Sequence, residues 1–137
     1  MTQKEKDLLL NDLCSRLPHG VIIEHKGNLS KLDAIFMCDS ISISSTSMDK
    51  KLSYNLDLDE VKPYLYPLSS MTEEQYKEYN TLRDSVPTYF YEFGDIVEDE
   101  VLYDNFKSID YLIVNHFDYR DLIPMGLAKD ATGLNIY

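Results

Sequence analysis

Residue types that commonly carry out catalysis gather in one short segment of the chain, around His116, Asp118 and Arg120. A histidine and an aspartate two residues apart could share a metal ion with a distant carboxylate, and an arginine could clamp an anion through two parallel hydrogen bonds. The structural alternative is that Asp118 caps the following turn while Arg120 pairs with Asp118 or Asp121. The segment therefore gives one alternative function, a small metal-dependent hydrolase centred on His116, Asp118 and Arg120.

Other reactive side chains are scattered. Cys14 falls on the apolar stripe of a predicted helix and Cys38 at the end of an apolar run, so we expect both to act as inert small hydrophobic residues. His19 and His25 lie far from His116 in the sequence and are expected in a turn and on an exposed strand position. The five glycines form no phosphate-binding motif, and the acidic clusters lack the ligand spacing of an EF-hand. The sequence thus indicates no cofactor and no metal.

The charge of the chain is strongly acidic and concentrated in its middle. The formal net charge is −11, from 13 basic and 24 acidic side chains, and residues 54–110 hold 14 of the acids but only four of the bases. Such a surface repels nucleic-acid phosphates, so direct nucleic-acid binding is not expected. It attracts basic protein partners instead.

The same segment is rich in tyrosine, because all 11 tyrosines lie at or after Tyr54. Tyrosine beside carboxylates is more typical of an interaction surface than of a catalytic cleft. A solvated face that maintains solubility is the simpler explanation. The carboxylates expected to contact a basic partner, as an inhibitor or DNA mimic would, are Asp57, Asp59, Glu60, Glu92, Asp95, Glu98, Asp99 and Glu100.

Hydrophobic periodicity predicts the elements that position these residues. Thr2 and Glu5 form a capping box, and apolar residues then recur at helical spacing over 3–17. Short apolar runs and period-two alternation predict three or four antiparallel strands within residues 20–58. Pro63 and Pro67 bracket the next segment and argue for an ordered connection in place of a long helix or a central strand.

Two further helices are expected after this connection. Thr72 and Gln75 form a second capping box that opens a helix over 72–85, and apolar spacing indicates another over 99–116. Residues 88–97 fit either an edge strand or a loop. The prediction is an α+β fold in a single domain, 1–137, with both later helices packed on one face of the sheet.

Three stretches carry a resemblance to a known family: LLLNDLCSRLPHGV at 8–21, VKPYLYPLSSMTEE at 61–74 and NHFDYRDLIPMGLA at 115–128. They resemble a family of small uncharacterised proteins from Bacteroides-type gut bacteria and their phages or prophage elements. The family usually has Arg at the position of Tyr66 and Gly at that of Asp121. The resemblance implies an origin and a common fold, and it brings no activity with it.

No apolar run approaches the ~20 residues of a membrane span, and the chain does not open with a secretory leader, so a cytoplasmic protein is expected without membrane contact. The main functional hypothesis is a non-enzymatic phage or mobile-element protein that binds another protein through the acidic segment. Besides the hydrolase, the remaining alternative is a structural homo-oligomer such as a homodimer, formed through an exposed sheet edge or the tyrosine-rich face.

Overall fold

The computed structural model describes residues 1–84 and 107–137. The chain opens with helix α1 (Gln3–Arg16), which begins at the expected capping box. The Thr2 hydroxyl accepts a hydrogen bond from the Glu5 backbone N–H at 3.1 Å, and the Glu5 carboxylate accepts one from the Thr2 N–H at 2.8 Å. A 3-10 turn, η1 (Leu17–His19), closes the helix at Gly20, whose φ of +76° favours glycine. The predicted N-terminal helix is confirmed.

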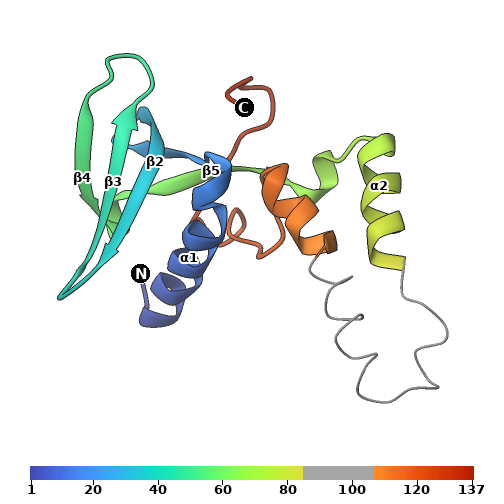
Figure 1. The fold of residues 1–137 in the computed structure, drawn as a ribbon, viewed down its shortest axis with the longest axis horizontal. Helices are drawn as coiled ribbons and strands as arrows, with labels where there is room; N and C mark the ends of the chain where they lie inside the picture. Colours follow the sequence, from blue (N-terminus) through green and yellow to red (C-terminus); the bar gives the residue numbers. More distant parts are fainter. Residues whose placement is uncertain (85–106) are drawn as a thin grey trace.

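Four antiparallel strands follow α1, as predicted for residues 20–58. Neighbours in sequence are also neighbours in the sheet, so the chain runs as a meander that leaves the last strand at an edge (Figure 1). A register shift between Leu32 and Ala34 marks a bulge in the second strand. The strands are β1 (Ile22–His25), β2 (Asn28–Met37), β3 (Ile41–Ser47) and β4 (Ser53–Asp57).

The segment bracketed by prolines is a strand and not a connection. After a 3-10 turn, η2 (Leu58–Glu60), strand β5 (Lys62–Pro67) pairs antiparallel with β1. It also pairs in parallel with two short strands, β6 (Phe117–Asp118) and β7 (Lys129–Asp130). The sheet is therefore mixed, and the described residues give it seven strands in the order β4-β3-β2-β1-β5-β6, with β7 also on β5. The expectation against a central strand was wrong because each ladder on β5 spans only two residues, so a proline costs little pairing.

The later helices lie beside the sheet. A 3-10 turn, η3 (Leu68–Ser70), leads to α2 (Glu73–Asp84), whose start shows the predicted capping box between Thr72 and Gln75. Residues 107–114 form the described part of the second predicted helix, and the Tyr111 hydroxyl donates to the Glu78 carboxylate at 3.0 Å. Figure 1 shows these two helices beyond the β5 side of the sheet and not over one of its faces. The start of the helix predicted over 99–116, and the ambiguous segment 88–97, lie outside the described residues.

The apolar core lies between α1 and one face of the sheet and extends under the last turns of the chain. Leu9 and Leu13 of α1 meet Ile23 and Leu32 of the sheet, and none of the four is more than 2 % exposed. Burial of this apolar surface supplies the main driving force for the fold. Two charged residues of α1, Asp12 and Arg16, are also fully buried beside this core.

Three sequence expectations about single residues are corrected. Cys14 and Cys38 are both exposed, because Cys14 lies off the buried side of α1 and Cys38 lies beyond the end of β2. His25 is buried and not exposed, and its ring lies 5.7 Å from that of Tyr54. In the part of the chain that the structure describes, no helix has the length and apolar character needed to cross a membrane.

Candidate functional site

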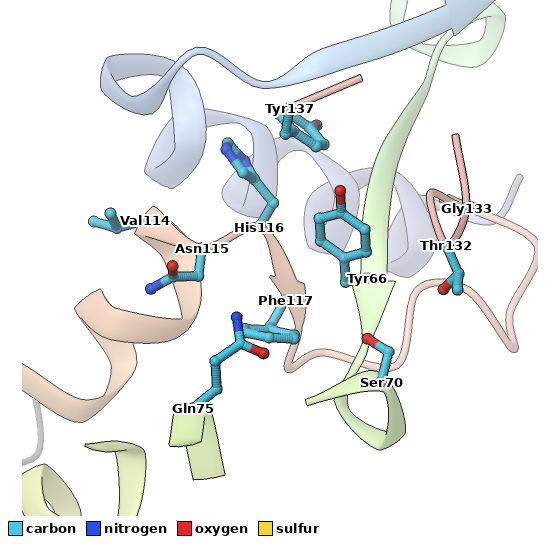
Figure 2. A pocket seen from close by; sticks show the side chains of 10 residues that line it. All are labelled: Tyr66, Ser70, Gln75, Val114, Asn115, His116, Phe117, Thr132, Gly133 and Tyr137. Carbon is cyan, nitrogen blue, oxygen red and sulfur yellow. The ribbon is translucent and has the colours of Figure 1, made fainter. Parts of the chain in front are cut away.

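A cleft of about 470 Å³ opens where β5, β6 and the last residues of the chain meet (Figure 2). Its volume is in the range of small-molecule sites. Segments that are far apart in sequence supply its walls: the end of β5 and η3, the start of α2, the turn after residues 107–114, and the final turn of the chain. The lining residues are Tyr66, Ser70, Gln75, Val114, Asn115, His116, Phe117, Thr132, Gly133 and Tyr137.

His116 enters the cleft from the turn that ends the helical residues 107–114. Its backbone N–H donates to the carbonyl oxygen of Ile113 at 3.1 Å, and its φ is +63°. Glycine is the usual residue where a helix ends in this left-handed conformation, and a side chain there costs about 1 kcal/mol or more. The backbone of His116 is therefore strained at a position that directs an imidazole into the cleft.

The imidazole of His116 stacks on the ring of Tyr137, with centroids 3.6 Å apart and planes 13° from parallel. Burial, the largest cause, and the positive charges of Arg16 and His19 together lower the pKa of His116 to about 4. The ring is therefore neutral at pH 7. Its Nδ1 is buried without a hydrogen-bond partner among the described residues, which leaves Nε2 as the nitrogen that a bound molecule can reach.

The hydroxyl of Tyr137 is not available to a ligand, because the sheet uses it. It donates to the carbonyl oxygen of Tyr64 at 2.6 Å and accepts from the backbone N–H of Ile22 at 3.0 Å. β1 and β5 pair directly as far as Ile23 and Pro63, so the hydroxyl bridges the next position of the ladder. Burial raises the pKa of Tyr137 well above its ordinary value, so the hydroxyl keeps its proton and can donate.

The two amide side chains of the cleft, Gln75 and Asn115, offer a ligand a hydrogen-bond donor and an acceptor, respectively. The Gln75 Oε1 accepts from the backbone N–H of Thr72 at 2.9 Å, which leaves the two amide N–H groups of Gln75 as donors. The Asn115 Nδ2 donates to the carbonyl oxygen of Tyr111 at 2.8 Å, which leaves the Asn115 Oδ1 as an acceptor. Gln75, on α2, thus supplies a hydrogen-bond donor to the cleft, and Asn115, after the helical residues 107–114, supplies an acceptor.

Three hydroxyl groups complete the polar lining. Ser70 donates to the carbonyl oxygen of Pro67 at 2.7 Å and keeps its acceptor capacity, whereas the hydroxyls of Tyr66 and Thr132 make no hydrogen bond within the described residues. Figure 2 shows these side chains around the cleft. Among the described residues that line the cleft, no side chain carries a charge at pH 7. The cleft therefore offers neutral donors and acceptors in a mixed arrangement.

A buried charge cluster contacts one wall of the cleft, at Phe117. Arg16 and Asp12, both fully buried, form an ion pair at 2.8 Å, and the Arg16 Nη2 donates to the carbonyl oxygen of Phe117 at 2.6 Å. The Nε of Arg120 lies 3.5 Å from the second Asp12 oxygen. The ring centroid of Tyr119 lies 5.4 Å from the guanidinium carbon of Arg16 and 5.0 Å from that of Arg120. This cluster ties α1 to β6 and to the turn that follows β6.

Asp12 is the central acceptor of that cluster. Burial raises the pKa of its carboxyl above the ordinary value, and the neighbouring Arg16 and Arg120 lower it in opposition. The Arg16 Nη1 has no hydrogen-bond partner among the described residues. The guanidinium of Arg16 also contributes to the depressed pKa of His116.

The structure separates the roles of the three residues expected at a catalytic site. Asp118 caps the following turn, as the structural alternative predicted: its two oxygens accept from the backbone N–H groups of Leu122 and Ile123, both at 2.9 Å. Arg120 pairs with Asp12 and not with Asp118 or Asp121, because α1 brings a buried carboxylate next to it. Only His116 of the three lines the cleft.

A shared metal has no support from this geometry. Both oxygens of Asp118 are already engaged by backbone N–H groups. No three His, Cys, Asp or Glu side chains gather closely enough to hold a metal ion anywhere in residues 1–84 and 107–137.

Three of the eight carboxylates expected to contact a basic partner lie within the described residues. Asp57 and Glu60 serve the start of η2, where the Glu60 carboxylate accepts from the Asp57 backbone N–H at 3.0 Å, and Asp59 pairs with Lys6 at 3.5 Å. All three are exposed. The other expected contact residues lie outside the described residues, so the acidic surface stays a prediction: Glu92, Asp95, Glu98, Asp99 and Glu100.

Sequence reasoning missed the buried pair and the role of the last tyrosine. Asp12 and Arg16 are four residues apart on the same side of α1 as Leu9 and Leu13, and charges on an apolar stripe are the signal that could have found them. No local signal marks Tyr137, because its partners are more than 70 residues away in sequence.

Comparisons with known proteins add no relative. A scan of protein-family models, a search of curated proteins and a search of solved structures each found no match to this chain.

Proposed function

We propose that this protein binds a small neutral ligand with several hydroxyl groups, of mono- or disaccharide size, in the cleft beside His116. The observation that carries the proposal is the polar lining: an amide donor from Gln75, an amide acceptor from Asn115 and hydroxyls that do both. Each sugar hydroxyl is both a donor and an acceptor, so a mixed neutral lining matches it. The cleft volume of about 470 Å³ fits a ligand of this size.

Charge argues for a neutral ligand. The described lining carries no charged side chain, and His116, with a pKa of about 4, is neutral at pH 7. The net charge of −11 repels anions from the whole molecule. A cation would find no side-chain carboxylate among the lining residues that are described. Specificity in such a cleft comes from unpaired hydrogen-bonding groups, which penalise a ligand that leaves them unsatisfied.

Ring geometry favours a sugar over a flat heterocycle. A flat base stacks best on an open aromatic face, or between two parallel ones. The Tyr66 ring is tilted by 57° to that of Phe117 and by 58° to that of Tyr137. Since His116 already stacks against Tyr137, the near-parallel pair is closed to an inserted ring.

The properties of His116 and its neighbours in the cleft support ligand binding without catalysis. A general base near pH 7 needs a pKa near that value, and His116 is far below it. Neither a carboxylate nor a thiol joins His116 among the described lining residues. A non-enzymatic protein was also the main expectation from the sequence.

The test is a titration of the protein with neutral mono- and disaccharides, a nucleoside and a sugar phosphate, followed by the amide shifts of Asn115, His116 and Thr132. Neutral sugars should shift these signals in a saturable way, and the other two ligands should not. Saturable binding of only the nucleoside or the sugar phosphate would overturn the proposal, as would the absence of any shift at millimolar sugar.

Three variants connect binding to the lining. Gln75→Glu keeps the oxygen that caps α2 but replaces the amide donors, Thr132→Val removes a hydroxyl at constant size, and Tyr66→Phe removes another. Each should weaken sugar binding about three- to tenfold, the cost of one hydrogen bond. Thr81→Val, a matched change on α2 outside the cleft, should leave the affinity unchanged.

A further inference from the structure

β4 is an open edge of the sheet. Within the described residues it pairs only with β3, and Figure 1 shows it as the outermost strand, with α1 nearer to β5. Its residues Ser53, Asn55 and Asp57 are exposed. An edge strand presents unpaired backbone N–H and C=O groups that can pair with another strand.

The hairpin hydrogen bonds show which of these groups point outward. The Ser47 backbone N–H donates to the carbonyl oxygen of Leu52 at 2.7 Å, which identifies a hydrogen-bonded pair of the β3–β4 ladder. Hydrogen-bonded and non-hydrogen-bonded pairs alternate along an antiparallel ladder, so Ser53 and Asn55 direct their backbone groups away from β3. The backbone groups of Asp57 also point away from β3, but the Glu60 carboxylate already accepts a hydrogen bond from the Asp57 N–H.

We propose that two copies of this chain pair through β4 as antiparallel strands, with Ser53 of each copy opposite Asn55 of the other. Each of these two equivalent pairs exchanges two backbone hydrogen bonds. The two-fold axis then passes between the Tyr54 residues of the copies. The outward N–H and C=O groups of Ser53 and Asn55 all find partners in this register, and the Asp57–Glu60 bond is kept.

The side chains of 52–57 are complementary to themselves in this register. On the core side of the sheet Leu52 faces Leu56 of the second copy, and Tyr54 faces Tyr54. Lys50 and Lys51, in the turn before β4, lie at the end of the strand that meets Asp57 of the second copy, so a basic end meets an acidic end twice. Leu52 is 50 % exposed in the single chain, so pairing covers an apolar side chain that this fold leaves in water. Charge complementarity of the strand with itself thus identifies a second copy as the occupant of this edge.

Other registers fit less well. A shift by one residue places apolar side chains opposite polar ones, because successive side chains point to opposite faces. Placing Asn55 opposite Asn55 requires the Asp57 N–H that Glu60 occupies. Placing Ser53 opposite Ser53 moves the basic turn before β4 level with Asn55 of the second copy and away from Asp57.

Sedimentation of the full chain over a range of concentrations is the first test. The wild type should form dimers at high concentration. Asn55→Pro removes one outward N–H without touching a bond to β3, and it should raise the dimer dissociation constant at least tenfold. Asn55→Ala keeps the N–H and should change it less than threefold. A wild type that stays monomeric at every concentration overturns the proposal, as does a dimer that Asn55→Pro leaves intact.

A disulfide test fixes the register and remains decisive if Asn55→Pro fails to fold. Cys14 and Cys38 are exposed and are first replaced by serine. In the proposed register the Cα atoms of the two Tyr54 residues lie about 4.5 Å apart, within the range of a disulfide. Those of the two Asn55 residues are separated by more than ~7 Å. Tyr54→Cys should therefore give a covalent dimer in a glutathione buffer, and Asn55→Cys should not. Cross-linking of Asn55→Cys alone, or of neither variant, overturns this pairing.

Discussion

Tyr137 completes the backbone ladder of the sheet at Tyr64, to whose carbonyl oxygen its hydroxyl donates at 2.6 Å. The same hydroxyl accepts from the N–H of Ile22 at 3.0 Å, so one side chain joins β1 to β5 where their direct pairing ends. The ring of Tyr137 also stacks on His116 in the cleft. The cleft and the centre of the sheet therefore share one residue, and changes at Tyr137 should affect both.

Tyr137→Phe keeps the ring stack and removes only the hydroxyl. The N–H of Ile22 and the carbonyl of Tyr64 then lose a partner inside the structure, so the free energy of unfolding should fall by about 1–3 kcal/mol. Urea unfolding at pH 7 measures this. Tyr76→Phe, at a residue 55 % exposed on α2, is the matched control and should change stability by less than about 0.5 kcal/mol. Equal values for the two variants would show that the bridge contributes nothing.

The depressed pKa of His116 predicts a pH dependence of stability. The folded value is about 4 and the unfolded value is near 6.5, so between these pH values the unfolded chain binds more protons than the folded one. The free energy of unfolding should therefore rise with pH from about 4 to about 6.5 and then level off as far as His116 is concerned. A proton NMR titration of His116 and urea unfolding at several pH values measure both quantities.

Substitution isolates this contribution. His116→Gln should flatten the rise, whereas His19→Gln, at an exposed position of η1, should keep it. A rise that persists in His116→Gln would assign it to another group.

The buried ion pair of α1 predicts strong coupling between its members. Asp12→Leu leaves the buried Arg16 without its carboxylate, and Arg16→Met leaves Asp12 without its guanidinium, so each should cost about 3–5 kcal/mol. The double variant removes both charges and should cost less than the sum of the single variants by about 2 kcal/mol or more. A double-mutant cycle in urea tests this, and strict additivity would contradict it.

The two hydrogen bonds that Asp118 accepts predict a graded loss of stability when its side chain is replaced. Its two oxygens each accept a backbone N–H, from Leu122 and from Ile123. Asp118→Asn retains one acceptor oxygen and should cost about 1–2 kcal/mol, whereas Asp118→Ala retains none and should cost about 2–3 kcal/mol. Asp121→Asn at the neighbouring exposed position should cost less than about 0.5 kcal/mol. Thermal or urea unfolding gives the order, and equal losses for all three would contradict the capping role.

The sequence by itself determined the elements whose signals are local. Thr2 with Glu5 and Thr72 with Gln75 predicted the starts of α1 and α2, and both capping boxes are present. Short apolar runs and, for the later strands, alternating side chains predicted the antiparallel strands of residues 20–58, because a strand with one buried face must alternate. The turn cap at Asp118 also followed from its neighbours.

Only the tertiary structure decided where β5 lies and how the cleft is built. The prolines of β5 disfavour a central strand locally, but two-residue ladders from both sides tolerate them. Arg120 finds Asp12 and Tyr137 finds Ile22, each across more than 100 residues. Such partners have no local signal, because their positions are set by burying the apolar face of α1 against the sheet, and that packing brings together groups that the sequence keeps apart.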